Sequence, residues 1–154
     1  MDSEINRVYG GRLRTRVCGL CWLEDKLLMV NHRMNGGTFW APPGGGLEYG
    51  QTIAETLVRE FQEEVRLQII PGRFLFGCEF IREPLHAVEL FFAVEAAGGV
   101  PQTGSDPELP GVIAEAQFLP LEAILALPES SRHGIFRFCE KPGDFQQLSG
   151  FYTI

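Results

Sequence analysis

The stretch from Gly44 to Leu67, GGGLEYGQTIAETLVREFQEEVRL, joins a run of glycines to a helical pattern and decides the fold. Apolar residues recur at every fourth position and predict a helix over about 52–65, with a buried stripe made of Ile53, Leu57, Phe61 and Val65. Thr52 stands where the helix should begin, and Glu55 follows three residues later, which is the spacing of a capping box.

Three carboxylates on this helix are the residues that indicate a functional site. Glu60, Glu63 and Glu64 are spaced i, i+3 and i+4, so they should share one face. Like charges repel, and a divalent cation with oxygen ligands, such as Mg²⁺, would resolve the conflict. The glycine run before the helix lets the backbone approach an anionic ligand. The alternative is a solvated acidic face, but Arg59, the cap and the buried stripe in the same segment favour a site.

The segment resembles the signature of the Nudix hydrolases, the MutT-like family. That signature places Gly before a Glu and ends in Arg-Glu-apolar-x-Glu-Glu-x-Gly-apolar. The positions that match in register, within a box over about 45–67, are Gly45, Arg59, Glu60, Phe61, Glu63, Glu64 and Leu67. Two positions depart from it, because Gln51 stands where the family has Glu and Arg66 where it has Gly.

Neither departure removes a carboxylate of the cluster. Gln51 can still accept a hydrogen bond from Arg59 through its amide oxygen, without the ionic component. Arg66 must either adopt a positive φ, at a cost of about 1 kcal/mol, or give the helix a different exit. A second hypothesis therefore stays open, in which the domain keeps the Nudix fold but is a non-catalytic nucleotide-binding or regulatory domain.

The resemblance implies an α/β fold, an α/β/α sandwich with a mixed β-sheet. It also implies metal-dependent hydrolysis of the pyrophosphate linkage of a nucleoside diphosphate linked to another moiety, with Mg²⁺ or Mn²⁺. The expected metal ligands are Glu60 and Glu64, with Glu63 as a third ligand or a supporting partner and the Gly44 carbonyl as a further one. The expected structural residues of the box are Gly45, Gln51 and Arg59.

In related enzymes the general base is either a Glu of the box or a Glu in a distant loop. Glu108 is the best loop candidate here and Glu115 the second, although Glu108 could also be a solvated loop acid. Arg33 follows the second predicted strand, where MutT-like proteins have a phosphate-contacting Arg; an ordinary surface Arg is the alternative.

Arg14 and Arg16 share one face of the first predicted strand, where they could bind an anionic substrate or line an exposed strand end. His32 and His86 receive no role, and Phe39 and Trp40 are expected in the core. Cys18 and Cys21 form the only Cys-x-x-Cys pair. A strand would point them to opposite faces, so we expect buried reduced thiols rather than a zinc site.

The 154 residues are expected to form one domain, residues 1–154, and the 45% hydrophobic content is typical of a globular protein. The net charge of −7 argues against nucleic acid as the partner, while a small phosphorylated nucleotide-type substrate is compatible with it. The sequence shows no membrane span or signal peptide, so we expect a cytoplasmic protein with no membrane partner. The protein could also form a homodimer, because homodimers are frequent in the family that it resembles.

The remaining pattern predicts strands over 12–22, 26–31, 67–70, 74–82, 87–96 and 114–119. It also predicts helices over 121–127 and around 132–140, whereas residues 1–10 show no clear pattern. Strands outnumber helices, and the long helix lies between strands. This order favours a mixed sheet with helices on both faces.

Overall fold

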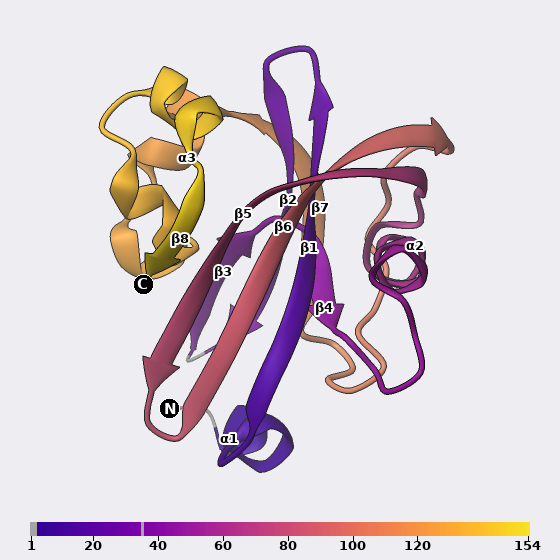
Figure 1. The fold of residues 1–154 in the computed structure, drawn as a ribbon, viewed down its shortest axis with the longest axis vertical. Coiled ribbons are helices and arrows are strands. Elements are labelled where there is room, and N and C mark those ends of the chain that lie inside the picture. The colour runs from indigo at the N-terminus through magenta and orange to yellow at the C-terminus, as the bar shows by residue number, and fades with distance from the viewer. Residues whose placement is uncertain (1–2, 35) are drawn as a thin grey trace.

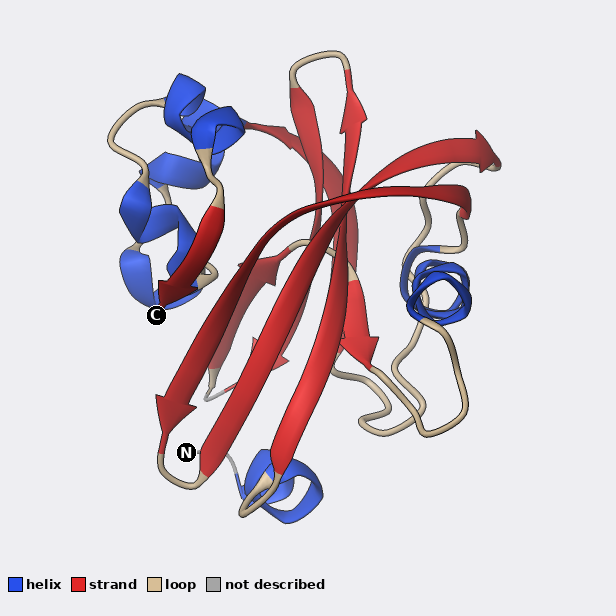
Figure 2. Ribbon diagram, viewed as in Figure 1, coloured by secondary structure: helices blue, strands red, loops and turns tan. Residues whose placement is uncertain are grey.

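A computed structural model describes residues 3–34 and 36–154, and it shows strands that form a mixed sheet with helices on both sides (Figure 1, Figure 2). The strands are β1 (Leu13–Leu23), β2 (Lys26–Met34), β3 (Gly37–Ala41), β4 (Gly44–Gly46), β5 (Gln68–Arg82), β6 (Leu85–Gly98), β7 (Ile113–Pro120) and β8 (Gly150–Thr153). The α-helices are α1 (Ser3–Tyr9), α2 (Ile53–Val65) and α3 (Leu121–Ala126). Three short 3₁₀ helices follow, η1 (Glu129–Ser131), η2 (Gly134–Phe138) and η3 (Pro142–Gln147).

The strand order is β3-β2-β1-β6-β5-β8, with β4 paired to β1 and β7 paired to β2. The predicted hairpin between β1 and β2 is present, but its ladder covers only Trp22↔Leu27 and Leu23↔Lys26. Beyond these pairs the two strands diverge. β1 runs parallel to β6 and antiparallel to β4, while β2 pairs with β3 and β7. This divergence brings the glycines of β4 beside β1, where they approach α2.

Apolar clusters fill both faces of the sheet. On the α2 side, Leu57, Phe61 and Val65 are fully buried, as the helical stripe predicts. On the opposite side, α3 and the 3₁₀ helices cover a cluster rich in aromatic rings (Figure 1). Cys18 belongs to the second cluster and Cys21 to the first, so the strand does point them to opposite faces. All four cysteines are free and buried, in agreement with the expectation of reduced thiols.

The prediction of separate strands over 67–70 and 74–82 is wrong, because β5 is continuous from Gln68 to Arg82. Pro71 lies opposite Val94, and the register shifts between Pro71 and Phe74. Between the pairs Pro71↔Val94 and Phe74↔Phe92, β5 has one residue more than β6, so a β-bulge follows Pro71. The Pro-Gly pair therefore bends this strand without ending it.

The predicted helix around 132–140 is also wrong, since only the 3₁₀ helix η2 occupies that segment. The ring of His133 accepts a hydrogen bond from the Ile135 amide at 3.1 Å and sets the start at Gly134, a poor α-helix former. The sequence pattern missed α1, β3, β4 and β8. The short strands among them depend on pairing with distant partners, as β4 does with β1 and β8 with β5.

Candidate functional site

Helix α2 presents the acidic residues, and both of its ends are fixed. At its start, the Thr52 hydroxyl accepts a hydrogen bond from the Glu55 amide at 3.1 Å. At its end, Arg66 adopts φ 57, so the positive-φ exit foreseen for this residue is the one present. The segment after β6 then donates to the last carbonyls of the helix, through the amides of Gln102, Gly104 and Ser105 at 2.8 Å each. A helix end needs such donors, and here they bring the 99–112 loop over the acidic face.

Arg59 ties the acidic face to the glycine loop. Its Nη1 donates to Glu60 at 2.9 Å and to Glu63 at 3.3 Å. Its Nε donates to the amide oxygen of Gln51 at 3.2 Å, so the hydrogen bond expected at the substituted position is present. Its Nη2 donates to the Gly46 carbonyl at 3.2 Å. One planar guanidinium thus holds two carboxylates and the loop in register.

Glu60 and Glu64 are only 9% and 4% exposed. The Gly44 amide donates to Glu64 at 3.2 Å, and a side chain at Gly45 would collide with the Glu60 carboxylate. Burial raises the pKa of Glu60 against the opposing charge of Arg59. Burial and the neighbouring Glu60 carboxylate raise the pKa of Glu64 well above its usual range. The pair is therefore short of positive charge when both groups are ionised.

This donor set fits a hard divalent cation. Carboxylate oxygens and a backbone carbonyl are the ligands that Mg²⁺ takes, and a cation at Glu60 and Glu64 would supply the positive charge that the buried pair lacks. The Gly44 carbonyl lies at the same loop and accepts a 3.4 Å contact from Arg16, which leaves it a second lone pair. Glu63 is more open, with a side chain 28% exposed, and it contacts Arg59.

His32 joins the site, although we expected no role for it from the sequence pattern. Its Nδ1 lies 3.1 Å from the Phe39 carbonyl, and its Nε2 lies 3.8 Å from Glu64. Burial lowers the pKa of His32, so the neutral ring with Nδ1 donating to Phe39 is favoured. Nε2 then faces Glu64 as an acceptor. Phe39 is half-buried, whereas Trp40 lies in the core as predicted.

The 99–112 loop contributes two acids. Glu108 lines a cavity beside the glycine loop, and its amide is held by Asp106 at 2.9 Å. Asp106, which the sequence pattern did not single out, lies near enough to raise the pKa of both Glu60 and Glu64. Glu115 instead accepts hydrogen bonds from Asn31 and Gln117 on the paired strands β2 and β7.

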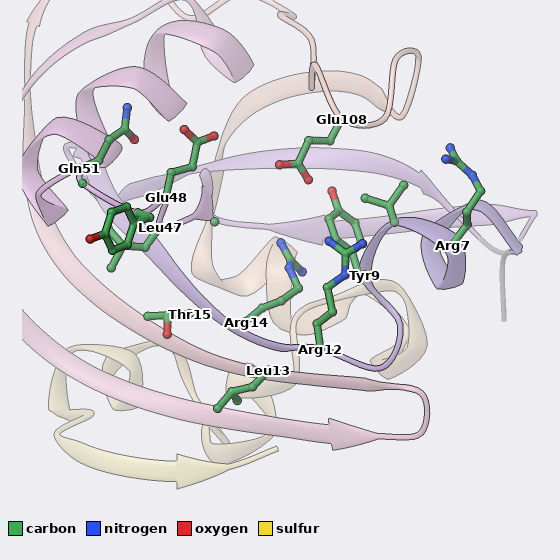
Figure 3. A pocket seen from close by; sticks show the side chains of 14 residues that line it. Arg7, Tyr9, Arg12, Leu13, Arg14, Thr15, Leu47, Glu48, Gln51 and Glu108 are labelled. Carbon is green, nitrogen blue, oxygen red and sulfur yellow. The ribbon is translucent and has the colours of Figure 1, made fainter.

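The two arginines predicted to share a strand face have different surroundings. Arg14 lines the cavity that contains Glu108, with its guanidinium 3.8 Å from the centre of the Tyr9 ring (Figure 3). Arg16 turns inward, where its Nη1 lies 2.6 Å from Glu89. It is therefore not on an exposed strand end. Arg33 donates to the carbonyls of Gly111 at 3.0 Å and Ile113 at 3.3 Å, away from that cavity.

Glu89 is a buried acid that the sequence pattern did not single out, because it lies within an apolar strand. Besides Arg16, it contacts His133 Nε2 at 2.7 Å and the thiols of Cys18 and Cys78 at 3.6 and 3.8 Å. Burial alone would raise the pKa of Glu89, but His133 and Arg16 outweigh burial and hold the pKa well below its usual range. Glu89 thus stays charged in the core.

A capped helix with buried paired carboxylates, an arginine hub and a glycine loop in this mixed sheet defines a Nudix-type site. The sequence model of the NUDIX domain matches residues 12–138, and the chain belongs to this family. Members of the family act on nucleotide substrates and generally use divalent metal ions. The fold is accordingly the α/β Nudix fold that the box predicted.

The chain is similar to an ADP-ribose pyrophosphatase of Methanocaldococcus jannaschii, with 33% identity over 110 residues, which are 68% of this chain and 60% of that protein. It is also similar to the phosphatase NudJ of Escherichia coli, with 29% identity over 56% of this chain and 57% of that protein. It therefore matches little more than half of the length of these relatives. A solved structure of a NUDIX hydrolase from Nitrosomonas europaea has the same fold, with a TM-score of 0.71 at 18% identity, over 90% of this chain and 93% of that one.

Within the part of the chain that the structure describes, no helix has the length and apolar character needed to cross a membrane.

Proposed function

We propose that the chain is a metal-dependent hydrolase that cleaves the pyrophosphate linkage of a nucleoside diphosphate linked to another moiety. The observation that carries this proposal is the buried pair of Glu60 and Glu64 beside the Gly44 loop. Burying two like charges is costly, and a divalent cation, Mg²⁺ or Mn²⁺, would offset that cost. A cation bound there would neutralise phosphate oxygens and lower the pKa of an attacking water.

The residues of the chain would position that chemistry. Arg59 holds Glu60 and Glu63 to the loop, and the Gly44 amide orients Glu64. In the reaction, the oxygen of a water molecule forms a bond to phosphorus while the bridging P–O bond breaks. The water proton passes to a carboxylate, and the leaving phosphate keeps the bonding electrons.

Two acids are suited to take that proton, and they differ in their surroundings. Glu63 is the more open of the box carboxylates and belongs to the acidic cluster. Glu108 sits on the loop over the box, but a side-chain hydrogen bond already joins it to Tyr9. Glu63 is itself bound to Arg59 at 3.3 Å, but it lies within the acidic cluster, so we propose Glu63 as the base. We assign Glu108 to the wall of the substrate cavity.

The three predicted substrate-binding arginines also differ in what they contact. Arg14 lies at the cavity and can contact substrate. Arg16 instead donates to Glu89 and contacts the Gly44 carbonyl. Arg33 is exposed and bound to loop carbonyls, so a contact with substrate phosphates would require it to leave them. We keep Arg33 as a candidate phosphate contact because it lies near the end of the second strand, where MutT-like proteins have a phosphate-contacting Arg.

The two departures from the family pattern leave the acidic cluster in place, which supports turnover over a purely binding domain. Gln51 still bonds Arg59, and Arg66 ends the helix in the left-handed conformation that the family glycine would adopt. The relatives suggest where to begin, because ADP-ribose is a nucleoside diphosphate linked to a sugar and gives its name to one of them.

The test is release of phosphate, or of nucleoside monophosphate, from ADP-ribose, nucleotide sugars, nucleoside triphosphates and dinucleoside polyphosphates, with Mg²⁺ and with Mn²⁺. Wild type and Glu64→Gln are compared, and Glu95→Gln is the matched control because Glu95 is exposed on β6. We expect turnover of one compound class that Glu64→Gln abolishes and Glu95→Gln retains. Absence of turnover from every class, with metal still bound, would make the chain a non-catalytic binder.

A further inference from the structure

A cavity of about 720 Å³ opens directly beside the glycine loop. One wall comes from α1 and the beginning of β1 and carries Arg7, Tyr9, Arg12 and Arg14 (Figure 3). The opposite wall is the loop over residues 46–51, and Glu108 closes the cavity from above in this view. The exposed Tyr49 also lines the cavity.

The cavity and the acidic cluster share one element. The Gly46 carbonyl accepts from Arg59, the same guanidinium that holds Glu60 and Glu63. Glu48, on the cavity wall, lies 3.8 Å from Arg59 as well. A diphosphate held through a cation at the carboxylates would therefore place one of its two substituents over Gly46 and into the cavity.

Positive charge is gathered on one wall of this cavity. Three arginines occur within eight residues there, in a chain whose net charge is −7. Arg14 is fixed over the Tyr9 ring, and burial together with the charge of Arg16 lowers the pKa of Arg14. An anion would relieve the like charges that crowd this wall, as a cation would relieve the carboxylates on α2.

The acids at the cavity leave part of this charge uncompensated. Glu48 faces Arg59, and Glu108 shares a hydrogen bond with Tyr9. Arg7 has an exposed contact with Glu4 at 3.7 Å, which contributes little. Arg12 is exposed and, among the described residues, has no ion-pair partner. Arg12 is one of the residues that line the cavity (Figure 3).

We propose that this cavity binds the half of the substrate beyond the cleaved diphosphate, and that this half carries a phosphoryl group of its own, held by Arg12 with Arg7 and Arg14. The inference rests on the proposed hydrolase function and narrows its substrate class. A phosphate monoester carries close to two negative charges at neutral pH, whereas a carboxylate carries one, so phosphate is the better match for several guanidinium groups.

The test uses pairs of substrates that differ by one phosphate outside the diphosphate: coenzyme A against 3′-dephospho-coenzyme A, and NADPH against NADH. For wild type we expect kcat/KM to favour the phosphorylated member of at least one pair by about tenfold or more, the worth of one charge-assisted contact. In Arg12→Gln that ratio should fall to about threefold or less. Arg12→Lys should recover part of it, and Arg73→Gln, an exposed change on β5, should leave it intact.

A binding measurement separates this inference from the hydrolase proposal. Calorimetry on the metal-free protein compares adenosine 3′,5′-bisphosphate with adenosine 5′-monophosphate, for wild type, Arg12→Gln and Arg73→Gln. Tighter binding of the bisphosphate that only Arg12→Gln loses supports the subsite, even if no compound is turned over. The subsite would be overturned by turnover with a kcat/KM ratio near one in both substrate pairs, together with equal binding of the two nucleotides. The hydrolase proposal would remain valid in that case.

Discussion

Nη1 of Arg16 lies 2.6 Å from Oε2 of Glu89, and this part-buried ion pair joins the glycine loop to the opposite side of the sheet. On the loop side, Arg16 contacts the Gly44 carbonyl at 3.4 Å. On the other side, Glu89 contacts His133, the residue from which η2 begins. The position of Gly44 therefore depends, through Arg16, on Glu89 and His133, which are not part of the acidic cluster.

Removing the charge of Glu89 should destabilise the fold. Glu89→Gln leaves the part-buried Arg16 and the buried His133 with a weaker partner, and we expect a loss of about 3 kcal/mol in the free energy of unfolding at pH 7. Because the folded-state pKa of Glu89 is depressed, its contribution is complete above the unfolded value of about 4.3 and declines as pH falls below that value. Urea unfolding at pH 7 and at pH 3.5 measures both effects.

The gap in stability between wild type and Glu89→Gln should thus be smaller at the lower pH. Glu95→Gln, on the same strand but exposed, should change the free energy of unfolding by less than about 0.5 kcal/mol. A gap that stays constant between the two pH values would mean that the Glu89 charge contributes nothing to folding.

Neutralising Glu64 should have the opposite effect on the metal-free protein. Its pKa is raised in the folded state, so its stabilising influence exists only at low pH and is lost as pH rises through the folded value. Glu64→Gln keeps an acceptor for the Gly44 amide but has no charge to bury. We expect Tm at pH 7.5 without metal to rise by about 3 °C, which corresponds to roughly 1 kcal/mol.

Addition of Mg²⁺ should reverse this ranking. Wild type should gain thermal stability with increasing Mg²⁺, because only the folded state holds the paired carboxylates, and Glu64→Gln should gain little. Removal of metal with a chelator should return wild type to the lower Tm. If wild type and the variant responded equally to Mg²⁺, Glu64 would not be a ligand.

Arg59→Lys tests whether one guanidinium has to hold the site together. Lysine cannot reach Gln51, Glu60, Glu63 and the Gly46 carbonyl at once, since it has a single nitrogen in place of the planar fork. We expect kcat to fall by about tenfold or more, because small displacements of catalytic groups are costly. Steady-state kinetics with Arg73→Lys as the control gives the comparison, and an unchanged kcat would contradict the hub role.

The local parts of the site were predictable from sequence because local spacing determines them. The helix over 52–65, its buried stripe, its cap and the shared face of the carboxylates follow from a period of 3.6 residues. The bond between Gln51 and Arg59 followed from the chemistry of an amide oxygen.

The remaining parts depend on contacts between segments far apart in the chain. Glu89 lies in an apolar strand, and only the parallel pairing of β1 with β6 reveals its role by placing it opposite Arg16. His32 faces Glu64 because β2 diverges from β1, and Asp106 faces the box because its loop caps α2. Pairing also turns residues 44–46 into a strand, although three glycines carry no strand pattern.

The left-handed end of α2 supplies a last prediction. Arg66 has φ 57, a conformation that costs an L-residue about 1–2 kcal/mol, while glycine adopts it freely. Arg66→Gly should therefore stabilise the fold by about 0.5–1 kcal/mol, after the greater flexibility of glycine in the unfolded chain is subtracted. Arg66→Ala is the matched control, because it removes the side chain and keeps the strain. Urea unfolding should rank glycine above both arginine and alanine, and equal stability of glycine and alanine would show that the strain is not relieved at this position.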